Sequence, residues 1–109
     1  MSTETTRAVV ARHLTELRAG NIDGVMADYA DHAIMVSNLG GLTKGAEALR
    51  VIFSHTPADL FEGMEIKAEH FDGEIGYVAW KTPRIPMGSD TFVVRDSKIV
   101  AQTVAMHLG

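Results

Sequence analysis

The sequence has no cysteine among its 109 residues. Disulfide bonds, thiolate metal sites and cysteine nucleophiles are therefore excluded. A long apolar run is also lacking, since none approaches the ~20 residues that a membrane-spanning helix needs. The first residues, MSTETTRAVV, have neither the basic segment nor the apolar segment of a signal peptide. We expect a cytoplasmic protein without a membrane partner.

An excess of positive charge is absent as well. Ten lysines and arginines stand against fourteen aspartates and glutamates, which gives a formal net charge of −4, and the basic residues are scattered along the chain. Nucleic acids bind positive patches, so we predict no nucleic-acid partner. The chain has no glycine-rich phosphate loop and no GxSxG motif.

Metal-binding spacing is missing too. Four histidines form no HxH or HxxxH pair and no ligand set with carboxylates: His32, His55, His70 and His107. Zinc sites in proteins usually show such local spacing. We therefore predict no metal site and no cofactor.

What the chain does contain is the composition of one ordinary globular domain. Apolar residues make up 46% and charged residues 22% of the sequence, as in typical folded proteins. The length suits a single domain over residues 1–109, and no linker or internal repeat divides it.

Apolar residues at helical spacing occur in the first half of the chain. They predict helices over residues 3–19, 21–29 and 45–55. In the first of these helices, the apolar stripe contains His13 between Val10 and Leu17. Gly20 is placed to end it.

The second half of the chain changes to a period of two. Together with an earlier apolar run, it predicts strands over residues 33–38, 64–70, 75–82, 88–95 and 98–108. Asp72-Gly73 and Asp96-Ser97 are placed to make the hairpin turns. Helices followed by antiparallel strands indicate an α+β fold, in which helices pack on one face of a sheet.

Two polar residues occupy positions where apolar residues are expected. His13 is either a core histidine with one satisfied nitrogen or a proton-exchanging group, because imidazole titrates near neutral pH. Asp90, in the run GSDTFVV, alternates with Phe92 and Val94 and so points inward if the strand includes it. The other interpretation of Asp90 is an exposed residue at the start of the strand or in the turn before it.

The order of these segments resembles a known family. The passage RHLTELRAGNIDGVMADYADHAIMVSNLGG, followed by KGAEALRVIF and GSDTFVVRDSKIVAQT, is similar to the nuclear transport factor 2 superfamily. Within it, the ketosteroid isomerase and SnoaL-like polyketide cyclase branches are the most similar. The resemblance implies a cone made by a strongly curved antiparallel sheet, with three helices on its concave face and an apolar pocket at the open end. It also implies a homodimer formed through the outer face of the sheet.

The resemblance also implies roles for individual residues. Ketosteroid isomerase moves a proton beside a carbonyl with an aspartate base, while a tyrosine and a neutral aspartic acid hold the enolate oxygen. The neutral acid falls on Asp90, and the tyrosine falls on His13. The base falls on Ser37, with Asn38 beside it. Because neither of these accepts a proton near pH 7, the family's general base is missing.

Most of the remaining pocket residues implied by the resemblance come from the strand faces; Tyr29, at the end of the second predicted helix, either reaches the pocket or caps the core at its rim. With Ser37 and Asn38, the expected substrate-binding set is Tyr29, Val78, Trp80, Phe92, Gln102, Val104 and Met106. For Val78 and Val104 the alternative of simple core packing is the stronger one. Buried indole and amide groups need hydrogen-bonding partners, so Trp80 and Gln102 fit either role.

Two functions follow as hypotheses. The first is a cofactor-independent acid–base enzyme, of isomerase or lyase type, that moves a proton on a small apolar carbonyl compound. Its catalytic residues are His13, which moves the proton, and Asp90, which either holds the imidazole or donates a hydrogen bond to an oxyanion. The second is a non-catalytic binder of a small hydrophobic ligand with the same fold. The missing first-strand carboxylate favours the second, whereas an enclosed His13–Asp90 pair favours the first.

Overall fold

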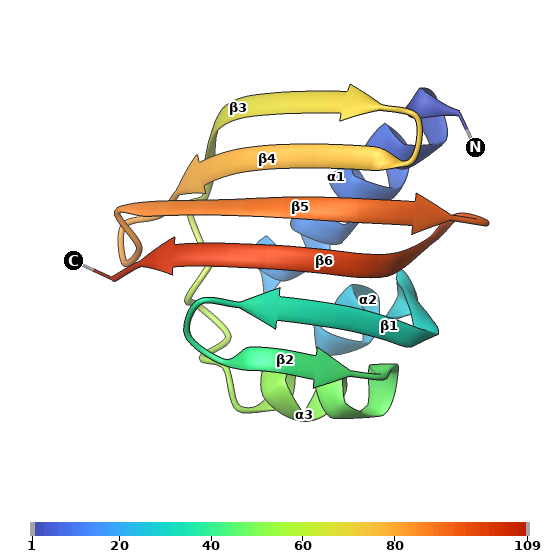
Figure 1. The fold of residues 1–109 in the computed structure, drawn as a ribbon. Coiled ribbons are helices and arrows are strands. Elements are labelled where there is room, and N and C mark those ends of the chain that lie inside the picture. The colour runs from blue at the N-terminus through green and yellow to red at the C-terminus, as the bar shows by residue number, and fades with distance from the viewer. Residues whose placement is uncertain (1, 109) are drawn as a thin grey trace.

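The computed structural model describes residues 2–108, which form three helices and six strands (Figure 1). The helices are α1 (Thr3–Ala19), α2 (Ile22–Ala27) and α3 (Ala46–Ser54). The strands are β1 (Tyr29–Ser37), β2 (Gly41–Lys44), β3 (Glu65–Asp72), β4 (Ile75–Lys81), β5 (Met87–Arg95) and β6 (Lys98–His107). The helices lie on one face of the sheet (Figure 1), so the predicted α+β fold is confirmed.

The six strands form one curved sheet in the order β2-β1-β6-β5-β4-β3. Every neighbouring pair is antiparallel except β1 and β6, which run parallel. This parallel pair differs from the all-antiparallel sheet that the sequence predicted. Register shifts interrupt the pairing of β1 with β6, β3 with β4 and β5 with β6. Such irregularities bend strands and increase twist, which curves the sheet toward the helices.

The ends of α1 follow from local chemistry. The Ser2 side chain accepts a hydrogen bond from the backbone N–H of Thr5, which caps the first turn. Gly20 ends the helix in the left-handed conformation, at φ 69°. The side of α1 that faces the sheet is apolar apart from two buried polar residues, Thr6 and His13.

The junction of α2 and β1 differs from the prediction. The predicted helix over 21–29 ends at Ala27, and β1 already begins at Tyr29. Asp28 lies between the two elements and is 1% exposed. Strand β2 was not among the predicted strands. Gly41, at φ 72°, begins this strand, which forms a hairpin with β1.

The hairpin of β5 and β6 was predicted correctly. Its turn residues, Asp96 and Ser97, have φ values of 49° and 61°. Two successive left-handed residues are the signature of the two-residue turn that matches strand twist. In β5 the buried residues alternate along the strand, and they include Asp90, Phe92 and Val94. Asp90 therefore points toward the helices.

Gly20 provides a test of how α1 is ended. A Cβ atom at this position would lie 2.6 Å from the backbone oxygen of Ala58, and φ is +69°. We expect Gly20→Ala to lower the free energy of unfolding by about 1–2 kcal/mol from the left-handed conformation alone, with the contact adding to it. Urea unfolding measures this. Gly40→Ala is the control, because a Cβ there has no neighbour within 4 Å; equal losses in both variants would contradict the account.

Candidate functional site

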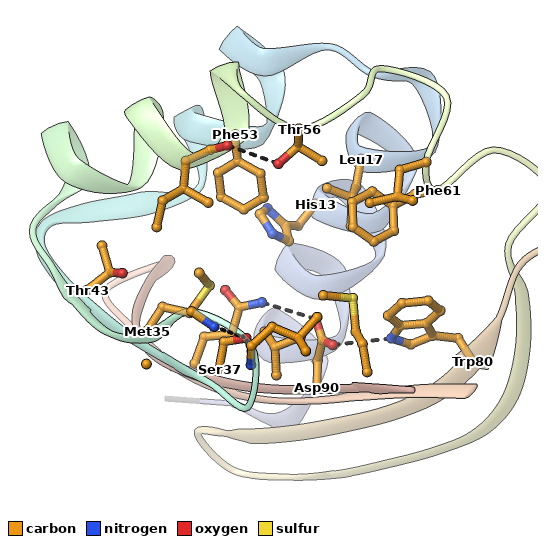
Figure 2. Close-up of a pocket in the computed structure, with 18 residues that line it drawn as sticks. His13, Leu17, Met35, Ser37, Thr43, Phe53, Thr56, Phe61, Trp80 and Asp90 are labelled. Atoms are coloured by element: carbon orange, nitrogen blue, oxygen red, sulfur yellow. Dashed lines mark hydrogen bonds between the residues drawn. The ribbon is translucent and has the colours of Figure 1, made fainter. Parts of the chain in front are cut away.

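A pocket of about 280 Å³ opens between the concave face of the sheet and the helices. In Figure 2, His13, Leu17, Phe53 and Phe61 lie on the helix side of it, and Asp90 lies on the sheet side. Its apolar lining is Leu17, Met35, Leu39, Ile52, Phe53, Leu60, Phe61, Trp80, Val104 and Met106. Its polar side chains are His13, Ser37, Thr43, Thr56, Asp90 and Gln102. Within the part of the chain that the structure describes, the lining contains no lysine or arginine and one carboxyl group.

That carboxyl group belongs to Asp90, which is 4% exposed. Its Oδ1 accepts a hydrogen bond of 3.2 Å from Trp80 Nε1, and its Oδ2 accepts one of 3.0 Å from Gln102 Nε2 (Figure 2). Burial raises the pKa of Asp90 to about 6, although Trp80, Gln102 and the nearby His13 favour the charged form. Asp90 is thus a carboxyl group that titrates close to neutral pH, and the exposed alternative considered from the sequence is excluded.

The position of Trp80 depends on the residue opposite to it. Gly88 of β5 pairs in register with Trp80 of β4. A Cβ atom at position 88 would lie 2.4 Å from the indole ring. The indole therefore occupies the space that a side chain at position 88 would fill, and this brings its N–H to Asp90.

His13 is held on both sides of its ring. It is 1% exposed, and its ring packs edge-on against Tyr29 and Phe92. Nε2 lies 3.3 Å from the hydroxyl of Tyr29. Nδ1 faces Oδ2 of Asp28 at 3.7 Å, which is longer than a hydrogen bond, and neither atom has another partner among residues 2–108. The contact with Asp28 is therefore electrostatic.

Asp28 and Arg12 are functional candidates that the sequence analysis missed. Arg12 donates two hydrogen bonds to Oδ1 of Asp28, of 2.8 Å from Nε and 2.6 Å from its terminal nitrogen. This leaves Oδ2 directed at His13. Burial alone would raise the pKa of Asp28, but the interactions with His13 and Arg12 outweigh it and hold the pKa below its usual value. Because Asp28 lies in neither a helix nor a strand, no periodicity marked it; its place just before Tyr29 was the available signal.

Tyr29 and Gln102 connect the two halves of the site. The Tyr29 hydroxyl donates to Oε1 of Gln102, while Gln102 donates to Asp90. Burial, together with the charges of Asp90 and Asp28, raises the pKa of Tyr29 well above its usual value, so the phenol stays neutral. The result is a continuous chain of polar contacts, buried except at Arg12: Arg12, Asp28, His13, Tyr29, Gln102, Asp90 and Trp80.

The predicted contact between His13 and Asp90 is therefore an indirect one. Both residues line the pocket. Over residues 2–108, however, no hydrogen bond joins them directly; Tyr29 and Gln102 lie between. Tyr29 was expected to line the pocket, and it instead lies behind the lining as a bridge.

The two candidates at the end of β1 separate. Ser37 lines the pocket, and its Oγ accepts hydrogen bonds from the backbone N–H groups of Leu39 and Gly40, at 3.1 Å and 3.4 Å. Asn38 is exposed and outside the pocket. Its amide exchanges two hydrogen bonds of 2.9 Å with the backbone of Met106. Asn38 thus ties the end of β1 to β6.

The other expected pocket residues also divide into two groups. Trp80, Gln102, Val104 and Met106 line the pocket. Val78 and Phe92 are fully buried and outside the lining, where they pack the core. Over residues 2–108, no group of three His, Cys, Asp or Glu side chains is placed to hold a metal ion. In the same range no helix is long and apolar enough to cross a membrane.

Comparison with solved structures found proteins of similar fold. A nuclear transport factor 2-like protein of unknown function from Burkholderia xenovorans LB400 matches 100% of this chain and 88% of its own, with a TM-score of 0.86 and 22% identity. A Kribbella flavida protein, provisionally assigned as a ketosteroid isomerase, matches 97% of this chain and 80% of its own, with a TM-score of 0.79 and 15% identity. A SnoaL-like protein of unknown function from Burkholderia thailandensis matches 95% of both chains, with a TM-score of 0.78 and 14% identity. The chain has the nuclear transport factor 2-like fold.

The predicted fold is thereby confirmed, and sequence identities this low extend no further than the fold. No family model and no curated protein matches the sequence. Within the nuclear transport factor 2-like fold of this chain, the pocket has a carboxyl group at Asp90 on β5 and a hydroxyl at Ser37 on β1. The chemistry available to it is that of one carboxyl, one imidazole, one amide and a few hydroxyl groups in an apolar wall.

The raised pKa of Asp90 predicts how stability depends on pH. The pKa is 3.8 for an ordinary aspartate and about 6 in the folded protein. The folded state therefore holds this proton more tightly, so the stabilisation is complete below the unfolded pKa and is lost as pH rises through about 6. We expect the free energy of unfolding of wild type, relative to Asp90→Asn, to fall by about 2 kcal/mol between about pH 4 and about pH 8. Urea unfolding at several pH values measures it.

Asp28→Asn is the matched control, because its carboxyl has a pKa shift of the opposite sign. The lowered pKa of Asp28 stabilises the fold above the unfolded pKa, and this is lost as pH falls through the folded value. A difference between wild type and Asp90→Asn that stays constant with pH would show that Asp90 titrates as an ordinary surface aspartate.

Proposed function

We propose that this protein is a cofactor-independent acid–base enzyme that moves a proton on a small, largely apolar carbonyl compound. The observation that carries the proposal is Asp90, a carboxyl group with a pKa raised to about 6 in the wall of an apolar pocket. A catalytic base works best when its pKa lies near the working pH. An ordinary exposed aspartate is too weak a base for this task.

The proton transfer is assigned as follows. Asp90, as the carboxylate, removes a proton from the carbon beside the carbonyl; the electron pair of the broken C–H bond forms the C=C bond of the enolate, and the π pair of the carbonyl moves to its oxygen. Asp90 then returns the proton to the same carbon or, where the substrate is a β,γ-unsaturated carbonyl compound, to the γ carbon of the dienolate, so no net proton is gained or lost. Trp80 and Gln102 hold the two carboxyl oxygens in place.

His13 was expected from the sequence to move the proton, but we assign that step to Asp90, whose pKa is raised to about 6, and propose that His13 stabilises the negative charge on the oxygen. Its ring lines the pocket, and its other side faces the carboxylate of Asp28, which Arg12 holds in place. Preorganised charge of this kind acts strongly in a site that excludes water. Ser37 offers a hydroxyl for orientation and replaces the base at this position of the ketosteroid isomerase pattern.

Proton–deuterium exchange tests this proposal. In D₂O, wild type should accelerate deuterium incorporation into a panel of cyclic ketones and β-keto compounds, with a rate that rises through about pH 6 as Asp90 ionises. We expect Asp90→Asn to lower the rate by roughly 10²–10⁴-fold. His13→Ala should lower it by roughly 10²–10³-fold. NMR follows the incorporation directly.

Asp72→Asn supplies the control, because it makes the same chemical change at an exposed carboxylate at the end of β3. It should leave the exchange rate unchanged. Equal rates for wild type, Asp90→Asn and His13→Ala would remove the enzyme proposal.

The second candidate is a non-catalytic binder of a small apolar ligand. The observation that favours it is Ser37, which puts a hydroxyl where the ketosteroid isomerase pattern has its base. Saturable binding of the same ketones without exchange in wild type would identify this function instead. The apolar lining serves either role.

A homodimer through the outer face of the sheet is also proposed. Away from the strand ends, where charged residues such as Lys81 of β4 and Arg95 of β5 lie, this face of the four central strands carries uncharged side chains: Ile34, Val36, Ile75, Tyr77, Ala79, Ser89, Thr91, Val93, Ala101, Thr103 and Ala105. Ile34, Val36 and Ile75 are 39%, 45% and 45% exposed. A surface of apolar and hydroxyl side chains without charge at its centre favours contact with another protein surface. A second copy offers the same uncharged surface, and two-fold pairing satisfies both.

Light scattering after gel filtration tests the dimer. Wild type should have twice the mass of one chain, and Thr103→Glu should have the mass of one chain because it buries a charge at the centre of the interface. Ala48→Glu adds the same charge at an exposed position of α3, away from this face, and should remain dimeric. Wild type at the mass of one chain, or a dimeric Thr103→Glu, would contradict this interface.

A further inference from the structure

We infer that His13 and Asp90 share one proton through the bridge of Tyr29 and Gln102, and that the Gln102 amide reverses when the proton changes side. This goes beyond the proposed function, since it describes how the site stores a proton with or without a substrate. The inference rests on the direction of each hydrogen bond along the buried chain.

Trp80 fixes one end of the chain. An indole N–H can only donate, so Oδ1 of Asp90 must accept at all times. A proton on Asp90 therefore belongs on Oδ2, the oxygen that lies 3.0 Å from the amide of Gln102. The charge state of Asp90 thus decides whether Gln102 presents its NH₂ or its carbonyl oxygen.

Asp28 fixes the other end. Arg12 occupies its Oδ1 with two hydrogen bonds, and its Oδ2 faces Nδ1 of His13. A carboxylate in that position favours a hydrogen on Nδ1. The variable nitrogen of His13 is then Nε2, which lies 3.3 Å from the Tyr29 hydroxyl.

In the first arrangement, Asp90 is a carboxylate. The NH₂ of Gln102 donates to Oδ2 of Asp90, and its carbonyl accepts from the Tyr29 hydroxyl. The Tyr29 oxygen then presents a lone pair to Nε2 of His13, so Nε2 must carry a hydrogen. With hydrogens on both nitrogens, His13 is an imidazolium.

In the second arrangement, Asp90 is neutral and every direction is reversed. Oδ2–H of Asp90 donates to the carbonyl of Gln102, whose amide has turned by half a rotation. The NH₂ of Gln102 donates to the Tyr29 oxygen, and the Tyr29 hydroxyl donates to Nε2 of a neutral His13. Both arrangements contain the same number of protons, and every buried group in the bridge has a partner.

The other two charge combinations leave a group without a partner. With a carboxylate at Asp90, a neutral His13 that carries its hydrogen on Nδ1 sets the Nε2 lone pair against a lone pair of the Tyr29 oxygen, and one that carries it on Nε2 sets the Nδ1 lone pair against the carboxylate of Asp28. A neutral Asp90 with an imidazolium leaves the Tyr29 hydroxyl hydrogen facing two donors. Unsatisfied buried polar groups are costly, so the two matched arrangements are favoured. The titratable and charged groups around the bridge are Arg12, Asp28, His13, Tyr29 and Asp90, and Phe92 contributes only an apolar ring edge.

Nitrogen NMR of His13 tests the inference, because ¹⁵N shifts distinguish a protonated from an unprotonated Nε2. Asp90→Asn imitates the neutral acid: its NH₂ replaces Oδ2–H and donates to the Gln102 carbonyl. At one fixed pH, this variant should lower the ratio of imidazolium to imidazole at His13 by roughly tenfold, the effect of a coupling of one pK unit. The Gln102 carbonyl should also lose the hydrogen bond that it accepts from the Tyr29 hydroxyl, and the ¹⁵N shift of the Gln102 side-chain amide reports this loss.

A second variant separates the bridge from simple charge repulsion through space. In a Tyr29→Phe background, Asp90→Asn should change the His13 ratio by less than about threefold, because only the through-space part of the coupling remains. Tyr77→Phe is the matched control: it removes the same hydroxyl from half-buried Tyr77 on β4, away from the bridge, and should leave the tenfold effect intact. An unchanged His13 pattern in Asp90→Asn, or an equal effect in the Tyr29→Phe background, would overturn the inference. Because no substrate is present, either result leaves the proposed exchange reaction to its own assay.

Discussion

The pocket depends on hydrogen bonds to polar groups that are buried away from water. A buried carboxyl group is costly unless donors surround it, and on the concave face of this sheet the donors come from neighbouring strands. Trp80 on β4 and Gln102 on β6 flank Asp90 on β5, and each supplies one N–H. The environment of Asp90 is therefore a property of three adjacent strands, and their register brings Trp80 and Gln102 within reach of its carboxyl group.

The same constraint explains the second buried carboxyl group. Asp28 is as enclosed as His13, yet its pKa is lowered while that of Asp90 is raised. The difference is the partner, because a guanidinium on α1 reaches Asp28 and only neutral donors hydrogen-bond to Asp90. Two carboxyl groups at opposite ends of one polar chain thus have opposite tendencies to hold a proton. In active sites, two groups whose pKa values are shifted in opposite directions commonly serve as the acid and the base.

Much of this architecture could be predicted from sequence, and particular residues show where prediction stops. Helix α1 and the β5–β6 hairpin follow from local periodicity and from turn residues, and the alternation of Asp90 with Phe92 correctly placed its side chain inward. The parallel pairing of β1 with β6 could not be predicted, because it joins segments about seventy residues apart and leaves no local pattern. The Asp28–Arg12 pair was missed because Asp28 lies between a helix and a strand, where no periodicity marks it. Asn38 was placed in the pocket because it adjoins Ser37, but neighbouring strand-end residues face opposite sides.

The close packing of Trp80 on Gly88 has a consequence for comparing sequences. The indole fits only because position 88 has no side chain. A related chain that keeps tryptophan at position 80 and gains an alanine or larger residue at position 88 must turn its indole elsewhere, and its aspartate would then lose a donor. One small residue, remote from any reacting atom, thereby distinguishes chains able to build this carboxyl environment from those that share only its outline.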